Sequence, residues 1–138
     1  MPRVRLLVLY AATESEIAAA FASIVEQHAG ALVTSSDVFS LAELEQIISL
    51  AGRYGVPTLF AARVPVAGGG LASYGAAPGE TLRQMGVYTG RILKGEKPAD
   101  LPIMRPTKFE FVINMKTAKA LGLTIPETLL ATADEVIQ

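Results

Sequence analysis

A chain of 138 residues is long enough for one hydrophobic core and too short for two independent ones. Its composition is 51% apolar and 18% charged, which favours an α/β sheet over disorder, and a net charge of −1 without a basic patch argues against a nucleic-acid partner. The chain has no cysteine, which excludes disulfides, thiolate nucleophiles and cysteine zinc sites.

The first apolar run, Val4 to Ala11, is continuous in the way that a strand covered on both faces requires. The arginines around its start also resemble a signal peptide, but Glu14 follows where a cleavage site would lie. We therefore predict a first β-strand here. No run approaches the ~18 apolar residues of a membrane span.

A helix is predicted next, because Thr13 and Glu16 have the spacing of a capping box. Five residues then recur on one helical face: Ile17, Phe21, Ile24, Val25 and His28. The single histidine has no partners for a zinc site, and its position favours a helix-end histidine over a member of a catalytic triad.

Two more strands and a helix follow. "ALVTSS" is predicted to be the second strand, and Ser40 with Glu43 forms a second capping box that begins a helix ending at Gly55. "VPTLFAA" is predicted to be the third strand. Two β-α-β units with short connections imply a parallel sheet with right-handed crossovers.

The stretch Gly68 to Gly75, "GGGLASYG", contains three consecutive glycines. A dinucleotide fingerprint needs a helix after its glycines, whereas a strand is predicted here, so a phosphate site is disfavoured. We interpret the glycines as a flexible approach to a fourth strand.

The last third of the chain is predicted to contain two helices, a strand and a final extended piece. The first helix begins near Pro78 and ends at Gly95, and its Gly86 and Gly90 suggest close backbone packing. "KFEFVINM" alternates like an edge strand, whose drier face is expected to hold Phe109, Phe111 and Ile113. A short helix to Leu121, a helical turn and an extended end complete the chain.

In an open parallel sheet, ligands bind beyond the carboxyl ends of the strands. This rule selects Tyr10 after the first strand, Ser36 and Asp37 after the second, and Arg63 after the third. A hydroxyl and a carboxylate could receive a ligand's ammonium group. The alternative is a turn in which Asp37 bonds its own backbone, which such residues commonly do.

Longer stretches resemble a known family. "GVPTLFAARVPVAGGGLASYG", "YTGRILKGEKPADLPI" and "PTKFEFVINMKTAKALGLTIPETLLATADEVI" are similar to the C-terminal part of the ABC-transporter substrate-binding proteins of the tryptophan/tyrosine type. "LVLYAATESEIAAAFASIVEQHAGALV" resembles the preceding β-α-β unit, so the similarity covers essentially the whole chain.

The resemblance implies a fold and a site. It implies an α/β lobe of the type I periplasmic-binding-protein kind, with a parallel three-layer (α-β-α) sheet, in which residues 1–138 form a single domain equivalent to the C-terminal lobe. The helix in residues 79–95 would belong to a second lobe or to a partner subunit. Ser73 and Tyr74 would lie near the cleft between lobes. Where the family carries Thr-Asp-Asn, this chain has Ser36, Asp37 and Val38.

The function implied is non-catalytic binding of a small molecule, such as an amino acid, for an ABC-type importer with its permease, without a cofactor or metal. The alternative is a truncated or repurposed α/β domain that acts as a dimeric interaction module. An exposed apolar helix face at Leu82, Met85 and Ile92 would favour a homodimer, with exchange of that helix as one route. A full-length binding protein would be periplasmic, and the chain expressed as it stands would be cytoplasmic.

Overall fold

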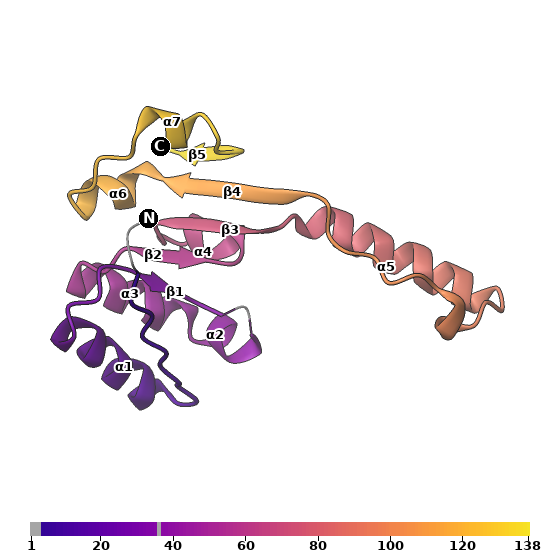
Figure 1. The fold of residues 1–138 in the computed structure, drawn as a ribbon, viewed down its shortest axis with the longest axis horizontal. Coiled ribbons are helices and arrows are strands. Elements are labelled where there is room, and N and C mark those ends of the chain that lie inside the picture. Colours follow the sequence, from indigo (N-terminus) through magenta and orange to yellow (C-terminus); the bar gives the residue numbers. More distant parts are fainter. Residues whose placement is uncertain (1–3, 36) are drawn as a thin grey trace.

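A computed structural model describes residues 4–35 and 37–138 and contains one five-stranded sheet (Figure 1). The strands lie in chain order: β1 (Leu32–Val33), β2 (Thr58–Phe60), β3 (Ala72–Ala76), β4 (Phe109–Asn114) and β5 (Glu135–Ile137). β1, β2 and β3 are parallel, β4 is antiparallel to β3, and β5 is parallel to β4. The α/β class is confirmed, and so is the second of the two predicted β-α-β units, in which β1 and β2 are parallel.

Seven α-helices and one 3₁₀ turn are formed by the described residues: α1 (Glu14–Glu26), α2 (Val38–Ala42), α3 (Leu44–Tyr54), α4 (Arg63–Ala67), α5 (Pro78–Leu93), η1 (Pro98–Asp100), α6 (Met115–Ala120) and α7 (Glu127–Leu130). The predicted N-cap of α1 is confirmed, since Thr13 Oγ1 accepts from the Glu16 amide at 3.3 Å.

Helix α4 is not among the predicted elements. Its five residues follow directly after a strand and are too few to show a helical repeat of apolar residues.

The hydrophobic core lies between α1, α3 and the sheet. It contains seven buried residues: Ile17, Phe21, Ile24, Ile47, Ala51, Val56 and Phe60. The predicted face of α1 is correct for its first three members, but Val25 is 44% exposed and His28 lies beyond the helix with a φ of 53°. The helix ends at Glu26, two residues before His28, because Gln27 forms its C-cap.

The predicted first strand is wrong. Residues 4–11 form no strand in the structure, and no backbone hydrogen bond joins this segment to the sheet as far as it is described. The apolar pattern of a doubly covered strand is present, but no neighbouring strand lies beside it to accept its hydrogen bonds.

Strand β4 also differs from its expectation. It lies between β3 and β5 rather than at an edge, because β5 adds to its outer side. The most buried residues are at its carboxyl end, Val112, Ile113 and Asn114, while Phe109 is 50% exposed. Side-chain alternation alone could not show that burial varies along the strand as well as between its faces.

The three glycines form a tight connection from α4 to β3. Gly69 has a φ of 111°, and the Gly70 amide donates to the Pro65 carbonyl at 2.8 Å. A Cβ on Gly70 would lie 2.5 Å from the Phe60 ring and 2.9 Å from the Pro65 carbonyl oxygen. These glycines permit close packing, so the interpretation as a flexible approach is wrong.

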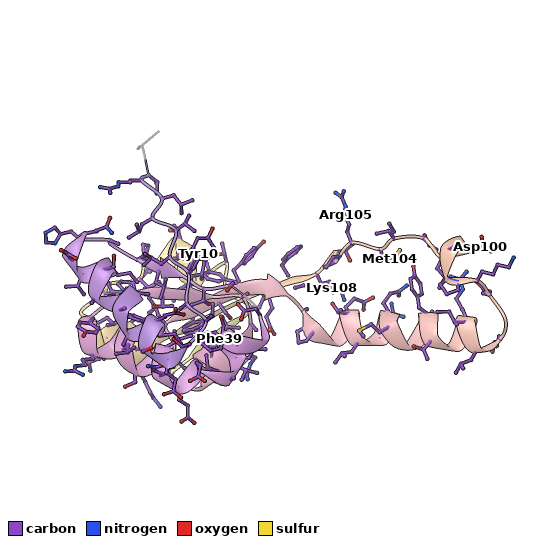
Figure 2. All side chains as sticks on the ribbon, turned by 90° about the horizontal axis from the view of Figure 1, so that it is seen from below. Tyr10, Phe39, Asp100, Met104, Arg105 and Lys108 are labelled. Carbon is purple, nitrogen blue, oxygen red and sulfur yellow. The ribbon has the colours of Figure 1, made fainter. Side chains whose placement is uncertain are left out.

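Residues 77–108 form a hairpin-like projection, here called the arm, which extends away from the sheet (Figure 1). Helix α5 runs outward, and an extended segment returns along it, with Asp100 far from the body and Lys108 close to it (Figure 2). The Ala77 amide donates to the Lys108 carbonyl at 3.0 Å at the base of the arm. None of the residues of α5 is buried.

Gly86 and Gly90 of α5 have no close neighbour. A Cβ added at Gly86 or Gly90 would meet no atom within 4 Å. The predicted backbone packing at these positions is therefore absent from this chain's own fold.

We predict that Gly70→Ala destabilises the protein by about 1–3 kcal/mol, because the new methyl group overpacks the contact with Phe60. Gly52→Ala is the matched control: its Cβ would meet nothing within 4 Å inside helix α3, so stability should rise by roughly 0.5–1 kcal/mol. Urea unfolding measures both, and equal stability of the two variants would contradict the packing role of Gly70.

Candidate functional site

Asp37 follows β1 and is the N-cap of helix α2. Its Oδ1 accepts from the Ser40 amide at 2.8 Å, and its Oδ2 accepts from the Ser40 hydroxyl at 2.8 Å and the Ser35 hydroxyl at 2.5 Å. The capping box predicted at Ser40 and Glu43 is therefore wrong, because the helix begins three residues earlier on the Asp37 carboxylate. The turn interpretation of Asp37 is the one seen in this structure.

These hydrogen bonds leave the Asp37 carboxylate charged. The Ser35 hydroxyl, followed by the amide and hydroxyl of Ser40, lowers the pKa of Asp37 from 3.8 to about 2. No Lys or Arg forms a salt bridge with it among the described residues. The Phe39 amide also contributes to lowering this pKa. An exposed, ionised carboxylate that has no charged partner can bind a cation.

Arg63, in the first turn of α4, is held by an ion pair. Its Nε and Nη2 donate to Glu135 Oε2 and Oε1, each at 2.6 Å. This bidentate pair joins α4 to β5, lowers the pKa of Glu135 and raises that of Arg63. The predicted ligand residue thus already has a partner, 72 positions away, and no sequence pattern indicated that pairing.

Ser73 and Tyr74 point to opposite faces of β3. Ser73 is 1% exposed and buried in the core, whereas Tyr74 is 56% exposed. The Tyr74 ring stacks on Phe109 at 5.6 Å between centroids and meets Phe111 edge-on at 6.3 Å. The structure therefore brings Tyr74, but not Ser73, to the surface near the base of the arm.

The remaining predicted residues do not join a cluster. Tyr10 is 89% exposed on the segment before α1 and lies on the surface of the body (Figure 2). Ser36 lies outside the described residues.

Two hollows open at the carboxyl end of β1. One has a volume of about 20 Å³ and a lining that includes Ser35, Ser40 and Ala61, and the other has a volume of about 150 Å³ and a lining that includes Ser35 and Asp37. Ligand pockets usually measure ≈ 300–1,000 Å³. Both hollows are smaller than such a pocket.

The arm contains a larger pocket of about 490 Å³. Its apolar lining includes Met85, Tyr88, Ile92, Leu101, Ile103 and Met104. The Tyr88 hydroxyl of α5 donates to the carbonyl oxygen of Pro102 in the return segment at 2.5 Å.

We expect the stabilising effect of Asp37 to depend on pH. A folded pKa of about 2 against an ordinary 3.8 means that this contribution is complete above about pH 5 and is lost as the pH falls toward 2. Asp37→Asn keeps a capping side chain without the charge. Its Tm should lie below that of the wild type at pH 6, and the two values should converge near pH 2. A difference in Tm that does not change with pH would contradict this account.

Comparisons with known proteins extend these observations. A family model described as "ABC transporter substrate binding protein" matches residues 3–137. A comparison with curated proteins found no match.

Three solved structures are similar. A conserved domain protein from Vibrio cholerae has a TM-score of 0.81 at 28% identity, over 89% of this chain and 41% of that chain. An ABC domain in complex with L-Trp from Streptococcus pneumoniae has a TM-score of 0.79 at 30% identity, over 91% and 43%. A substrate binding protein with adhesive properties from Clostridium difficile has a TM-score of 0.62 at 23% identity, over 91% and 42%, and supports the fold alone.

The chain thus spans about two-fifths of the length of these solved structures. The family model, by contrast, matches nearly all of its residues. The chain belongs to the ABC transporter substrate-binding protein family, whose members bind their substrates without catalysing a reaction.

Proposed function

We propose that this chain is the C-terminal lobe of a two-lobed solute-binding protein of an ABC-type importer. In this proposal the carboxyl ends of β1 to β3 form one wall of the ligand cleft, and a second lobe supplies the other wall. The ligand is a small molecule with an ammonium group, such as an amino acid. The importer's permease would be the partner of the two-lobed protein.

The arm is the observation that carries this proposal. The polypeptide leaves the sheet at Ala76, the end of β3, and returns at Phe109, the start of β4. Between them, a 16-residue helix buries none of its residues. Leu82, Met85 and Leu93 of this helix are 65%, 60% and 83% exposed. A helix with such a surface belongs to a second body that covers it.

The chemistry at Asp37 supports an amine-bearing ligand. Its carboxylate is ionised at neutral pH, exposed, and held in place by three hydrogen bonds. A charged ammonium group would neutralise this carboxylate. The Streptococcus pneumoniae relative was solved with L-Trp, an α-amino acid.

Nuclear magnetic resonance can test this wall on the chain as it is, because it detects weak binding. Adding L-Trp and other amino acids should shift the amide signals near Asp37 and Ser40. Asp37→Asn should abolish the shifts, or weaken binding by about 10–100-fold, as expected for loss of a charged hydrogen bond. Glu45→Gln, which removes an exposed charge from α3, is the matched control and should leave them unchanged.

Two results would overturn the proposed ligand wall. One is the absence of shifts near Asp37 with every amino acid tested. The other is equal loss of binding in the Asp37 and Glu45 variants, which would indicate a general effect of charge.

Transport would place the two-lobed protein outside the cytoplasmic membrane, where binding proteins deliver solutes to a permease. In residues 4–35 and 37–138 no helix is long and apolar enough to span a bilayer. We propose the extracytoplasmic location for the longer protein.

A second candidate function is favoured by the arm itself. A second copy of the chain could cover the apolar surface of α5, so that the chain acts as a homodimeric module, with exchange of this helix between protomers as one route. The pocket of about 490 Å³ along the arm offers apolar contacts for such a partner.

Light scattering distinguishes the two candidates. The dimer candidate predicts a mass of two chains at concentrations well above micromolar, and Met85→Glu should shift it toward one chain, because a charge would enter an apolar contact. Ala19→Glu, on the exposed face of α1, should leave the dimer intact. A monomeric wild-type chain would refute the dimer candidate and leave the second lobe as the cover of the arm.

A further inference from the structure

The smaller of the two hollows at the carboxyl end of β1 borders the Asp37 carboxylate. Ser35 and Ser40 line this hollow, and both of their hydroxyls donate to Asp37 Oδ2, at 2.5 and 2.8 Å. A serine hydroxyl has one hydrogen to donate, so these two oxygens have only lone pairs left for a ligand. The carboxylate and the rim of the hollow therefore offer acceptors to a ligand group that donates.

The same hollow offers no positive charge to a ligand. Among residues 4–35 and 37–138, no Lys, Arg or His lines it, and Thr34 supplies its one remaining side-chain hydroxyl. Arg63, which follows β2, donates its Nε and Nη2 to Glu135 instead. A ligand's carboxylate placed here would meet the ionised Asp37 carboxylate with no cation beside it to offset the repulsion.

The rest of the lining is apolar and includes Leu41, Leu44, Ala61 and Pro65. Pro65 has no backbone N–H to donate. The Ala61 carbonyl oxygen lies against β3, because a Cβ on Gly75 would overlap it. Leu41 is 52% exposed, so the apolar surface continues from the hollow to the outside. The volume of about 20 Å³ has room for about one water-sized group, such as a methyl.

We propose that Asp37, Ser35, Ser40 and Leu41 form an alkylammonium subsite. The ligand's ammonium binds the Asp37 carboxylate and the two serine oxygens, and a short alkyl group of the same ligand packs against Leu41 with one methyl in the hollow. This subsite rests on the proposed ligand wall and names the substrate class: an aliphatic primary amine, of which aliphatic amino acids are one kind. A carboxylate on the ligand is not bound by this lobe.

Matched small molecules test the subsite by nuclear magnetic resonance on the 138-residue chain. Isobutylammonium carries both features, and L-valine adds a carboxylate to it. Isovalerate has a carboxylate in place of the ammonium, and 1-amino-2-propanol has a hydroxyl in place of one methyl. Tetramethylammonium keeps the charge but has no N–H to donate.

The amide signals of Ser35 and Ser40 report the result. We expect isobutylammonium to bind at least as tightly as L-valine, because the added carboxylate gains no contact here. Isovalerate and tetramethylammonium should cause no shift. Binding of 1-amino-2-propanol should be weaker by about 3–10-fold, because its hydroxyl loses water in an apolar hollow.

A leucine variant isolates the alkyl contact. Leu41→Ala should weaken isobutylammonium binding by about 3–10-fold through loss of apolar contact. Methylammonium has no alkyl group long enough to reach this contact, so its binding should not change, which also shows that the variant is folded. Leu129→Ala is the matched control, because Leu129 of α7 is exposed to a similar extent, at 42%, and lines neither hollow.

The possible failures are distinguishable. Shifts with L-valine but none with isobutylammonium would overturn the subsite and leave the ligand wall standing. Binding of isovalerate, binding of tetramethylammonium as tight as that of isobutylammonium, or equal effects of the two leucine variants would also overturn the subsite. No shift near Asp37 with any amine or amino acid would overturn both the subsite and the ligand wall.

Discussion

The antiparallel pairing of β3 and β4 is the constraint on which the arm and the site depend. Five residue pairs, from Ala72 opposite Ile113 to Ala76 opposite Phe109, hold the departure and return of the polypeptide side by side. The rest of the sheet is parallel apart from this pair. Residues 77–108, 32 in all, can therefore project from the sheet while β3 and β4 keep their pairing register. The same two strands carry the exposed aromatic rings of Tyr74 and Phe109 to the base of the arm.

Asp37 and Arg63, which follow the carboxyl ends of β1 and β2, stabilise the fold and also set the charge of this edge of the sheet. Asp37 caps α2 and stays ionised because hydroxyl and amide donors stabilise its charge. Arg63 neutralises Glu135 and ties α4 to the far edge strand. At the proposed ligand wall, a ligand would therefore meet an ionised carboxylate and a guanidinium that is already paired. This asymmetry favours recognition of a cationic group over an anionic one.

The sequence predicted most of this lobe because local signals agree with the fold. Thr13 and Gly55 mark helix ends that the structure confirms, and the alternation of "KFEFVINM" located β4. Two of the failures have the same physical origin, which is dependence on distant partners. Val4 to Ala11 has a strand's composition but no neighbour, and the Arg63–Glu135 pair spans 72 positions. Asp37 was recognised as a polar site residue, while its competing role as a cap depended on where α2 begins.

The central claim is that this chain is one lobe whose arm belongs to another body. Hydrogen exchange of the chain at a concentration where it is monomeric tests this claim most directly. The account predicts that the amides of α5 exchange far faster than those of β2 and β4, because α5 buries no residue whereas Phe60 and Val112 are buried. Exchange in α5 as slow as in β4, in a monomer, would show that the arm is stable on its own and would contradict the account.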